Sequence, residues 1–289
     1  MDSVAVLIAA PGSGAIGADV VALLRKFGAP PLRWLAEAEA AEIDAFGRLE
    51  EFRAAVSGLP IDIAIVPKAN RRKRLLVADM DSTMIEQECI DELGVIAGVG
   101  EAIKAITWRA MRGELDFAGA LRERVALMRG LDAGAIETIL RERITYAPGG
   151  RTLVSTMKAH GARAALVSGG FRQFTAAVAV RLGFDTHEAN DLVIDNGKLA
   201  GRVREPVLGK EAKVAALRRL THELAITEDD ALAVGDGAND IPMLLAAGMG
   251  VALHAKPKVR EQARIAINHG GLTALLYLQG YTKAQFIGA

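Results

Sequence analysis

The sequence has little cysteine, few aromatic residues and no net charge. Cys89 is the single cysteine among 289 residues, which excludes an internal disulfide and indicates a reducing compartment. Aromatic residues make up 4% while hydrophobic residues make up 51%, so the apolar content is mainly aliphatic and favours an α/β core over an aromatic-rich β-sandwich. Lys plus Arg and Asp plus Glu each total 35, so no global field attracts nucleic acid or an anionic membrane.

Long hydrophobic runs are also lacking. The longest stretch without a charged residue, 265–282, contains Asn268, His269 and Gln279, which excludes a membrane span. The apolar N-terminal run has no basic segment before it and stops at Pro11, so we do not expect it to be a signal peptide. We therefore expect a soluble, cytoplasmic protein that has neither nucleic acid nor membrane as a partner.

The length predicts about two domains, at roughly 150 residues per domain. A polar, basic segment at 67–74 separates two parts, which places the domains at 1–68 and 72–289. In the first part, hydrophobic periodicity predicts a strand, a helix, two strands, a helix and a strand. This βαββαβ order is typical of a ferredoxin-like domain. The predicted elements are strand 4–10, helix 18–27, two strands within 32–46, helix 49–56 and strand 61–66.

In the second part, short apolar strands alternate with helices, which predicts a Rossmann-like parallel sheet with helices on both faces. The predicted strands are 75–79, 164–167, 231–234, 250–253 and 263–267. A helical block from about 86 to 145 interrupts this pattern, and we interpret it as an inserted cap over one end of the sheet. Asn196-Gly197 between apolar residues predicts a β-hairpin within 192–201.

One glycine motif in the first part admits two interpretations. Gly12-Ser-Gly14-Ala-Ile-Gly17 follows a strand and opens a helix, as in a dinucleotide-binding fingerprint. That site requires a parallel βαβ unit, whereas the residues after Gly17 predict ββαβ in a short domain. We favour a simple strand–turn–helix and keep an NAD oxidoreductase as an alternative.

Two carboxylates, Asp79 and Asp81, stand at the end of the predicted strand 75–79. Ligands of parallel α/β sheets gather at the carboxyl ends of strands. In extended chain, residues i and i+2 point the same way, so one carboxylate can attack phosphorus while the other handles the leaving-group proton. A calcium-binding EF-hand loop would need glycine and glutamate where Met84 and Ile90 stand, which excludes that reading.

Three later segments place polar groups at other predicted strand ends. Ser168-Gly169-Gly170 offers a hydroxyl and closely approachable backbone N–H groups. A lysine opens a predicted helix, either Lys213 or its rival Lys210. The segment 235–240, Gly-Asp-Gly-Ala-Asn-Asp, again places carboxylates just past an apolar strand.

These strings, with Asp79-Met-Asp-Ser-Thr83, resemble the haloacid dehalogenase-like phosphatase superfamily, and within it the phosphoserine phosphatases of the bacterial SerB type. The resemblance covers about residues 72–289. It implies that Asp79 is the nucleophile that forms an aspartyl-phosphate and that Asp81 is the proton donor and later the base. It also implies Mg²⁺ bound by Asp79, the backbone carbonyl of Asp81, and Asp236, with Asp240 in the outer shell.

The resemblance further implies how substrate is bound. Ser168, Gly169 and Lys213 would contact the phosphoryl oxygens and Asn239 would orient near them, with Lys213 preferred because it lies 23 residues before Asp236. In the phosphoserine branch, an acidic residue after the first motif meets the substrate's amino group and a cap arginine meets its carboxylate. Those positions are Glu88 and Arg124 here, with Arg122 as the runner-up for the arginine and Met111 and Phe117 as apolar cap neighbours.

The expected reaction is hydrolysis of O-phospho-L-serine to L-serine and phosphate, the last step of serine biosynthesis. The alternatives are a phosphatase or phosphotransferase acting on another small phosphomonoester, such as phosphothreonine or phosphohomoserine, and a regulatory protein that uses the fold only as a receiver. The first 68 residues look like an ACT-type module, which implies a regulatory or oligomerisation role, with L-serine or another amino acid as a possible effector and a homodimer as a possible assembly.

Overall fold

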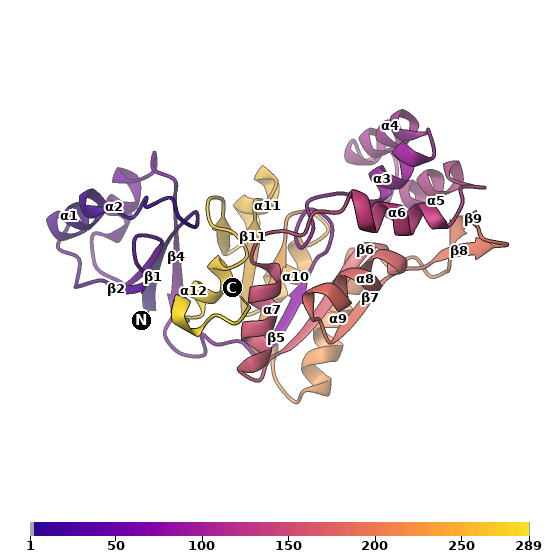
Figure 1. Cartoon of the computed structure of the whole chain (residues 1–289). Coiled ribbons are helices and arrows are strands. Elements are labelled where there is room, and N and C mark those ends of the chain that lie inside the picture. The colour runs from indigo at the N-terminus through magenta and orange to yellow at the C-terminus, as the bar shows by residue number, and fades with distance from the viewer. Residues whose placement is uncertain (1–2, 289) are drawn as a thin grey trace.

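The protein is an elongated arrangement of three parts in a computed structural model that describes residues 3–288. Figure 1 shows an N-terminal sheet covered by helices at one end, a parallel sheet between helices in the middle, and a helical cap at the other end. None of the helices described between residues 3 and 288 is long and apolar enough to cross a membrane.

The N-terminal module has the predicted βαββαβ order. Its strands pair only antiparallel, in the sheet order β2-β3-β1-β4, which is the ferredoxin-like arrangement. The glycine-rich loop at 12–17 therefore follows a strand that lies in no parallel βαβ unit, and the dinucleotide alternative has no support in this topology. The elements are β1 (Ser3–Ala9), α1 (Ala18–Lys26), β2 (Arg33–Ala36), β3 (Ala40–Asp44), α2 (Leu49–Ala55) and β4 (Ile61–Pro67).

Strand β1 is buried on both faces, which explains why its sequence is continuously apolar. Successive side chains of a strand point to opposite faces. Ala5 and Leu7 pack with the module's own helices. Val6 and Ile8 belong instead to the large core cluster that extends through the second part of the chain. The module is therefore fused to the central sheet through a shared hydrophobic core.

Three hydrogen bonds to one buried carboxylate reinforce the contact between the module and the central sheet. The buried Asp62 carboxylate of β4 accepts hydrogen bonds from the backbone N–H groups of Asn268, His269 and Gly270, each at 2.8 Å. Hydrogen bonds to a charged acceptor are stronger than neutral ones. They fix the loop that follows the last strand of the central sheet against the module.

The central sheet is parallel throughout, in the order β12-β11-β10-β5-β6-β7. Five strands correspond to the predicted ones, and β7 was missed because its sequence, Thr-His-Glu-Ala-Asn, has no apolar alternation. The strands are β5 (Leu75–Ala78), β6 (Arg163–Phe171), β7 (Thr186–Asn190), β10 (Ala231–Gly235), β11 (Met249–Leu253) and β12 (Ile265–Ile267). The helices are α7 (Gly150–Ala159), α8 (Arg172–Leu182), α9 (Lys210–Glu223), α10 (Ile241–Ala246), α11 (Pro257–Gln262) and α12 (Ala274–Leu278), with short 3₁₀ turns η1 (Glu228–Asp230) and η2 (Lys283–Gln285).

The cap combines two separate insertions. The predicted hairpin forms around Asn196 and Gly197, whose φ angles of 50° and 75° suit a two-residue turn. It packs on the cap helices through Leu199, which accepts a 2.8 Å hydrogen bond from Gly130 N–H and donates one of 2.8 Å to the Leu131 carbonyl. The cap elements are α3 (Cys89–Ile96), α4 (Gly100–Met111), α5 (Phe117–Leu127), α6 (Gly134–Glu142), β8 (Leu192–Asp195) and β9 (Lys198–Val203).

Candidate active site

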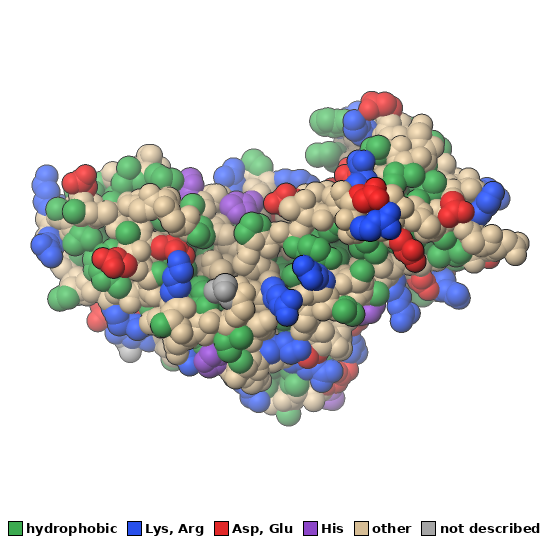
Figure 2. Space-filling view, viewed as in Figure 1, with side chains coloured by type: hydrophobic (Ala, Val, Ile, Leu, Met, Phe, Trp, Pro, Cys, Tyr) green, Lys and Arg blue, Asp and Glu red, His purple; other side chains and the backbone are tan. Residues whose placement is uncertain are grey.

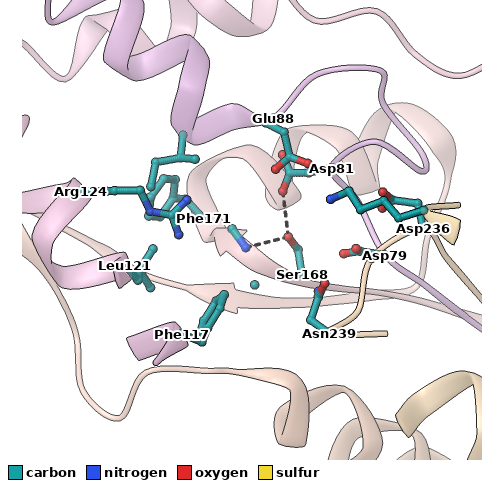
Figure 3. Close-up of a pocket in the computed structure, with 15 residues that line it drawn as sticks. Asp79, Asp81, Glu88, Phe117, Leu121, Arg124, Ser168, Phe171, Asp236 and Asn239 are labelled. Carbon is teal, nitrogen blue, oxygen red and sulfur yellow. Dashed lines mark hydrogen bonds between the residues drawn. The ribbon is translucent and has the colours of Figure 1, made fainter. Parts of the chain in front are cut away.

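The three middle strands of the central sheet end at one small cavity. Strands β10, β5 and β6 are neighbours and parallel, so the residues that follow them meet at the same edge. The cavity has a volume of about 190 Å³. Figure 3 shows Arg124, Leu121 and Phe117 of the cap on one side of it, Asp79 and Asp236 on the other. Among the residues predicted from the sequence, those lining it are Asp79, Asp81, Glu88, Phe117, Arg124, Ser168, Gly169, Asp236 and Asn239.

Asp79 is held rigidly in the floor of the site. Its Oδ1 accepts hydrogen bonds from its neighbour's backbone, Met80 N–H at 2.8 Å, and from the Lys213 ammonium at 2.7 Å. Burial and the nearby Asp240 charge raise the pKa of Asp79, and the Lys213 charge opposes that rise. One carboxylate oxygen is thus fixed by donors, which orients the group as a nucleophile requires.

Lys213 lies behind Asp79, on the first turn of α9. Its ammonium joins Asp79 at 2.7 Å and Asp240 at 2.5 Å, and its side chain is almost fully buried. Burial alone lowers the pKa of Lys213, but the two carboxylates outweigh it, so the pKa is raised and the lysine stays charged. The rival Lys210 is exposed and lies 3.9 Å from Glu211. Lys213 is absent from the cavity lining, so its contact with phosphate stays a prediction.

Asp81 is oriented by a different set of donors. Its Oδ1 accepts from Cys89 N–H at 2.9 Å and its Oδ2 from the Ser168 hydroxyl at 3.1 Å, while Ser168 Oγ accepts from Gly170 N–H at 2.8 Å (Figure 3). A Cβ on Gly170 would lie 2.6 Å from Asp81 Oδ2, so only glycine allows this approach. Burial, then the charge of Glu88, raises the pKa of Asp81 to about 6, which suits a group that gives and takes a proton.

Asp79, Asp236 and Asp240 place carboxylate oxygens within 4.8 Å of one another. Burial and then the Asp240 charge raise the pKa of Asp236 to about 6. Three clustered carboxylates with one ammonium leave negative charge uncompensated, and hard oxygen donors of this kind suit a divalent cation such as Mg²⁺. A Cβ on Gly235 would lie 2.3 Å from Asp240 Cγ, so the first glycine of the Gly-Asp-Gly segment makes room for Asp240.

The opposite wall offers one arginine without a carboxylate partner. Arg124 donates to the Ala120 carbonyl at 3.2 Å and lies 3.5 Å from Thr107 Oγ1, and it forms no ion pair with any residue in the described range 3–288. The runner-up, Arg122, is already paired with Glu205 at 2.9 Å and stands outside the cavity. The structure therefore favours Arg124 over Arg122 as a free cation facing the site.

Two other predicted neighbours differ in their placement. Phe117 lies in the cavity wall, whereas Met111 is 66% exposed and does not line the cavity. Met111 lies at the C-terminal end of α4, where its side chain faces solvent. Glu88 lines the cavity and its carboxylate accepts from the Ser82 hydroxyl at 2.9 Å.

Among the residues that the sequence analysis missed are two polar ones, Lys256 in the cavity lining and Asn190 beside it. Lys256 lines the cavity three positions after β11, and the rule that ligands gather at strand ends could have indicated it. Asn190, at the end of β7, donates to the carbonyls of Gly169 at 2.9 Å and Leu208 at 3.1 Å and accepts from Leu208 N–H at 2.7 Å. It joins the Ser168 loop to the segment before α9, and no sequence signal pointed to it.

Comparisons with known proteins agree with this geometry. Residues 76–245 match the family of haloacid dehalogenase-like hydrolases. Phosphoserine phosphatases from Streptomyces coelicolor and Albidiferax ferrireducens are 43% and 45% identical over 79% and 71% of this chain, which spans 56% and 89% of their respective lengths. The structure of a probable phosphoserine phosphatase from Vibrio cholerae has a TM-score of 0.83 at 31% identity, covering 98% of this chain and 88% of that one.

Proposed function

Because the chain belongs to the haloacid dehalogenase-like hydrolase family, we propose that it hydrolyses O-phospho-L-serine to L-serine and phosphate, the last step of serine biosynthesis. The observation that carries the substrate assignment is Arg124, an unpaired guanidinium across a small cavity from two oriented carboxylates. A guanidinium can bind a carboxylate with two parallel hydrogen bonds. Glu88 on the same cavity would meet the amino group, so the pair would recognise a zwitterion.

In the first step, a carboxylate oxygen of Asp79 attacks phosphorus and the bond from phosphorus to the seryl oxygen breaks. The departing oxygen takes a proton from Asp81, whose raised pKa keeps a share of it protonated near neutrality. The products of this step are serine and an aspartyl-phosphate on Asp79. Fixed donors around both carboxylates keep the geometry without reorganisation.

In the second step, ionised Asp81 takes a proton from a water molecule, and the hydroxide oxygen attacks the phosphorus of the aspartyl-phosphate. The bond from phosphorus to Asp79 breaks, which releases phosphate and restores both carboxyl groups. Ser168, Gly169, Lys213 and Asn239 would hold the phosphoryl oxygens during both steps. Charge stabilisation and positioning of this kind supply most of the catalysis in phosphoryl transfer.

Asp79, the Asp81 carbonyl and Asp236 would hold Mg²⁺, with Asp240 behind them. When bound, the ion supplies positive charge that reduces the repulsion between Asp79 and the phosphate dianion. Asp240 also holds the Lys213 ammonium at 2.5 Å and accepts from Gly237 N–H at 3.0 Å. Asp240 would therefore position both the lysine and the loop that carries Asp236.

Changing Arg124 to Ala should raise KM for phosphoserine about 10- to 150-fold, because a hydrogen-bonded charge contact contributes about 1.5–3 kcal/mol. Turnover of p-nitrophenyl phosphate, which has no carboxylate, should change little. The measurement is phosphate release from phosphoserine, phosphothreonine, phosphohomoserine and p-nitrophenyl phosphate. Arg122→Ala is the matched control, since Arg122 pairs with Glu205. Equal losses on all four substrates would remove Arg124 from substrate recognition, and preference for another phosphomonoester would replace the proposed substrate.

Mg²⁺ should raise the melting temperature more at pH 7.5 than at pH 5. In the metal-free protein, the pKa values of Asp81 and Asp236 are raised to about 6 from an ordinary 3.8. The folded state thus binds these two protons more tightly than the unfolded state does. Protonation of the two carboxyl groups therefore adds to the free energy of unfolding below about pH 4, and this contribution is lost as pH rises through about 6. A cation compensates the charge that then develops. Thermal unfolding with EDTA or Mg²⁺ at both pH values measures this, and an equal or smaller gain at pH 7.5 would contradict it.

The N-terminal module would serve regulation or assembly. Support comes from its ferredoxin-like strand order, which resembles ACT-type modules, and from β2 at the edge of the sheet, where a strand of a second copy could pair. L-serine or another amino acid would be the effector and a homodimer the assembly.

A further inference from the structure

A second cavity, of about 580 Å³, lies between the N-terminal module and the base of the cap. The module contributes Pro11 and Glu39 to its lining, and the chain entering and leaving the cap contributes Ile85 and Pro148. In Figure 2, histidine side chains lie at the surface between the module and the cap. The volume is within the range of about 300–1,000 Å³ that small-molecule sites have.

The cavity touches both segments that join the first cap insertion to the sheet. These segments are bonded to each other: Glu86 N–H donates to the Thr145 carbonyl at 3.0 Å and Ala147 N–H to the Met84 carbonyl at 3.0 Å. Glu86 and Ala147 both line the cavity. We call these two bonded segments the cap hinge, and a molecule bound in the cavity would contact both of them.

The cavity also shares a loop with the active site. Ser82 and Thr83 line the cavity, while their hydroxyls donate to residues of the active-site wall. Ser82 Oγ bonds the Glu88 carboxylate at 2.9 Å, and Thr83 Oγ1 lies 3.4 Å from Asp236 Oδ1. The two cavities are therefore separated by one turn of chain.

The side chains that line the cavity favour a ligand with an apolar body and one negatively charged group. Leu253, Leu272 and Phe286 supply apolar surface. The imidazoles of His254 and His269 also line the cavity, and neither has a hydrogen-bond partner in the described part of the chain. His254 has a φ of 45°, a strained value for a residue with a side chain.

One of the two carboxylates in the cavity lining, that of Glu39, is paired. Glu39 accepts from the Tyr277 hydroxyl at 2.8 Å and pairs with the Lys283 ammonium at 2.7 Å. Glu86, like His254 and His269, is exposed to water, which screens its charge. Two free imidazoles thus remain as donors for an anionic group.

We propose that this cavity binds a small carboxylic acid with a ring-sized apolar body, and that binding stabilises the cap hinge. The carboxylate would accept hydrogen bonds from His254 and His269 while the ring packs on the apolar lining. A ligand that binds one arrangement of the hinge better than another shifts the cap toward that arrangement.

The test uses the full chain and 3-phenylpropionate as the probe. Isothermal titration should give binding of the acid with a dissociation constant of about a few millimolar, as expected for so small a ligand. The matched amide, 3-phenylpropionamide, should bind at least about tenfold more weakly, because it lacks the charge. Equal affinity of acid and amide, or no binding of the acid, would overturn the proposal.

Two variants locate the binding. His269→Ala removes an exposed ring and keeps the backbone bond to Asp62, and His254→Gly suits the positive φ. Each variant should bind 3-phenylpropionate more weakly, whereas the control variant His222→Ala, at an exposed position, should bind it as before. Unchanged affinity in both cavity variants would show that the acid does not bind in this cavity.

Hydrogen exchange tests the effect on the hinge. The probe should slow hydrogen exchange at the backbone amides of Glu86 and Ala147. Exchange at the amide of Leu199, at the far end of the cap, should be unchanged. Binding without slower exchange at the hinge would overturn the coupling. No readout depends on turnover, so this proposal and the phosphatase proposal can fail separately.

Discussion

Replacing Asp79 with Asn should abolish turnover, with kcat falling roughly 10⁴- to 10⁶-fold, as for removal of other catalytic nucleophiles. An amide oxygen is a poor nucleophile, so no bond to phosphorus forms and no alkali-labile aspartyl-phosphate accumulates. The measurements are phosphate release from phosphoserine and acid-quench trapping of labelled protein.

The variant should remain folded, because Asp240 still pairs with Lys213 at 2.5 Å after the substitution. Thermal unfolding separates lost chemistry from lost structure. Asp195→Asn, on the exposed cap hairpin, is the matched control and should keep full activity. The nucleophile assignment would be wrong if Asp79→Asn kept a turnover within tenfold of the unmodified protein. It would also be wrong if the variant accumulated as much labelled phosphoenzyme as the unmodified protein.

Replacing Asp81 with Asn should lower kcat for phosphoserine by about 10²- to 10⁴-fold, the usual contribution of a general acid–base group. The asparagine Oδ1 can still accept the hydrogen bond from Cys89 N–H, and its Nδ2 can donate to the Ser168 hydroxyl oxygen in place of the bond that Asp81 Oδ2 accepts, so the loop should keep its shape. What disappears is the proton given to the seryl oxygen and the base that activates water.

The choice of substrate separates these two losses. p-Nitrophenolate leaves without a proton, so the first step on p-nitrophenyl phosphate should survive in Asp81→Asn while the second slows. Rapid mixing should then show a burst of p-nitrophenol near one equivalent of enzyme, followed by slow release and a trapped aspartyl-phosphate. Full steady-state activity, or a loss without any phosphoenzyme, would contradict the two-step role of Asp81.

Much of the site follows from one regularity of parallel sheets. Asp79 and Asp236 could be predicted because each stands just past an apolar strand, and parallel strands bring their carboxyl ends together. The fold class was predicted for the same reason, since apolar strands alternating with helices are legible in the sequence. Strand β7 was not predicted, because it lies at the edge of the sheet, where a strand needs less apolar sequence, and Thr186–Asn190 contains only one hydrophobic residue.

The choice between neighbouring charged residues could not be made from periodicity. Arg122 and Arg124 lie on the same helix, and the folded structure distinguishes them: Arg122 pairs with Glu205 outside the cavity, whereas Arg124 lines the cavity and forms no ion pair in the described chain. Asn190 was missed because its role depends on two backbone segments that meet only after folding. Likewise, the second cap insertion could be predicted as a hairpin but not placed on the cap.

The double burial of β1 has a consequence for how the molecule unfolds. Because alternate side chains of one strand belong to two cores, pulling the module away would expose Val6 and Ile8 together with their partners in the catalytic part. The segment 67–74 is thus no flexible tether between independent bodies. We therefore expect the module and the sheet to unfold as one cooperative unit, and an effector of the kind proposed for the module would act on the rest of the chain through this shared packing rather than through a swing of domains.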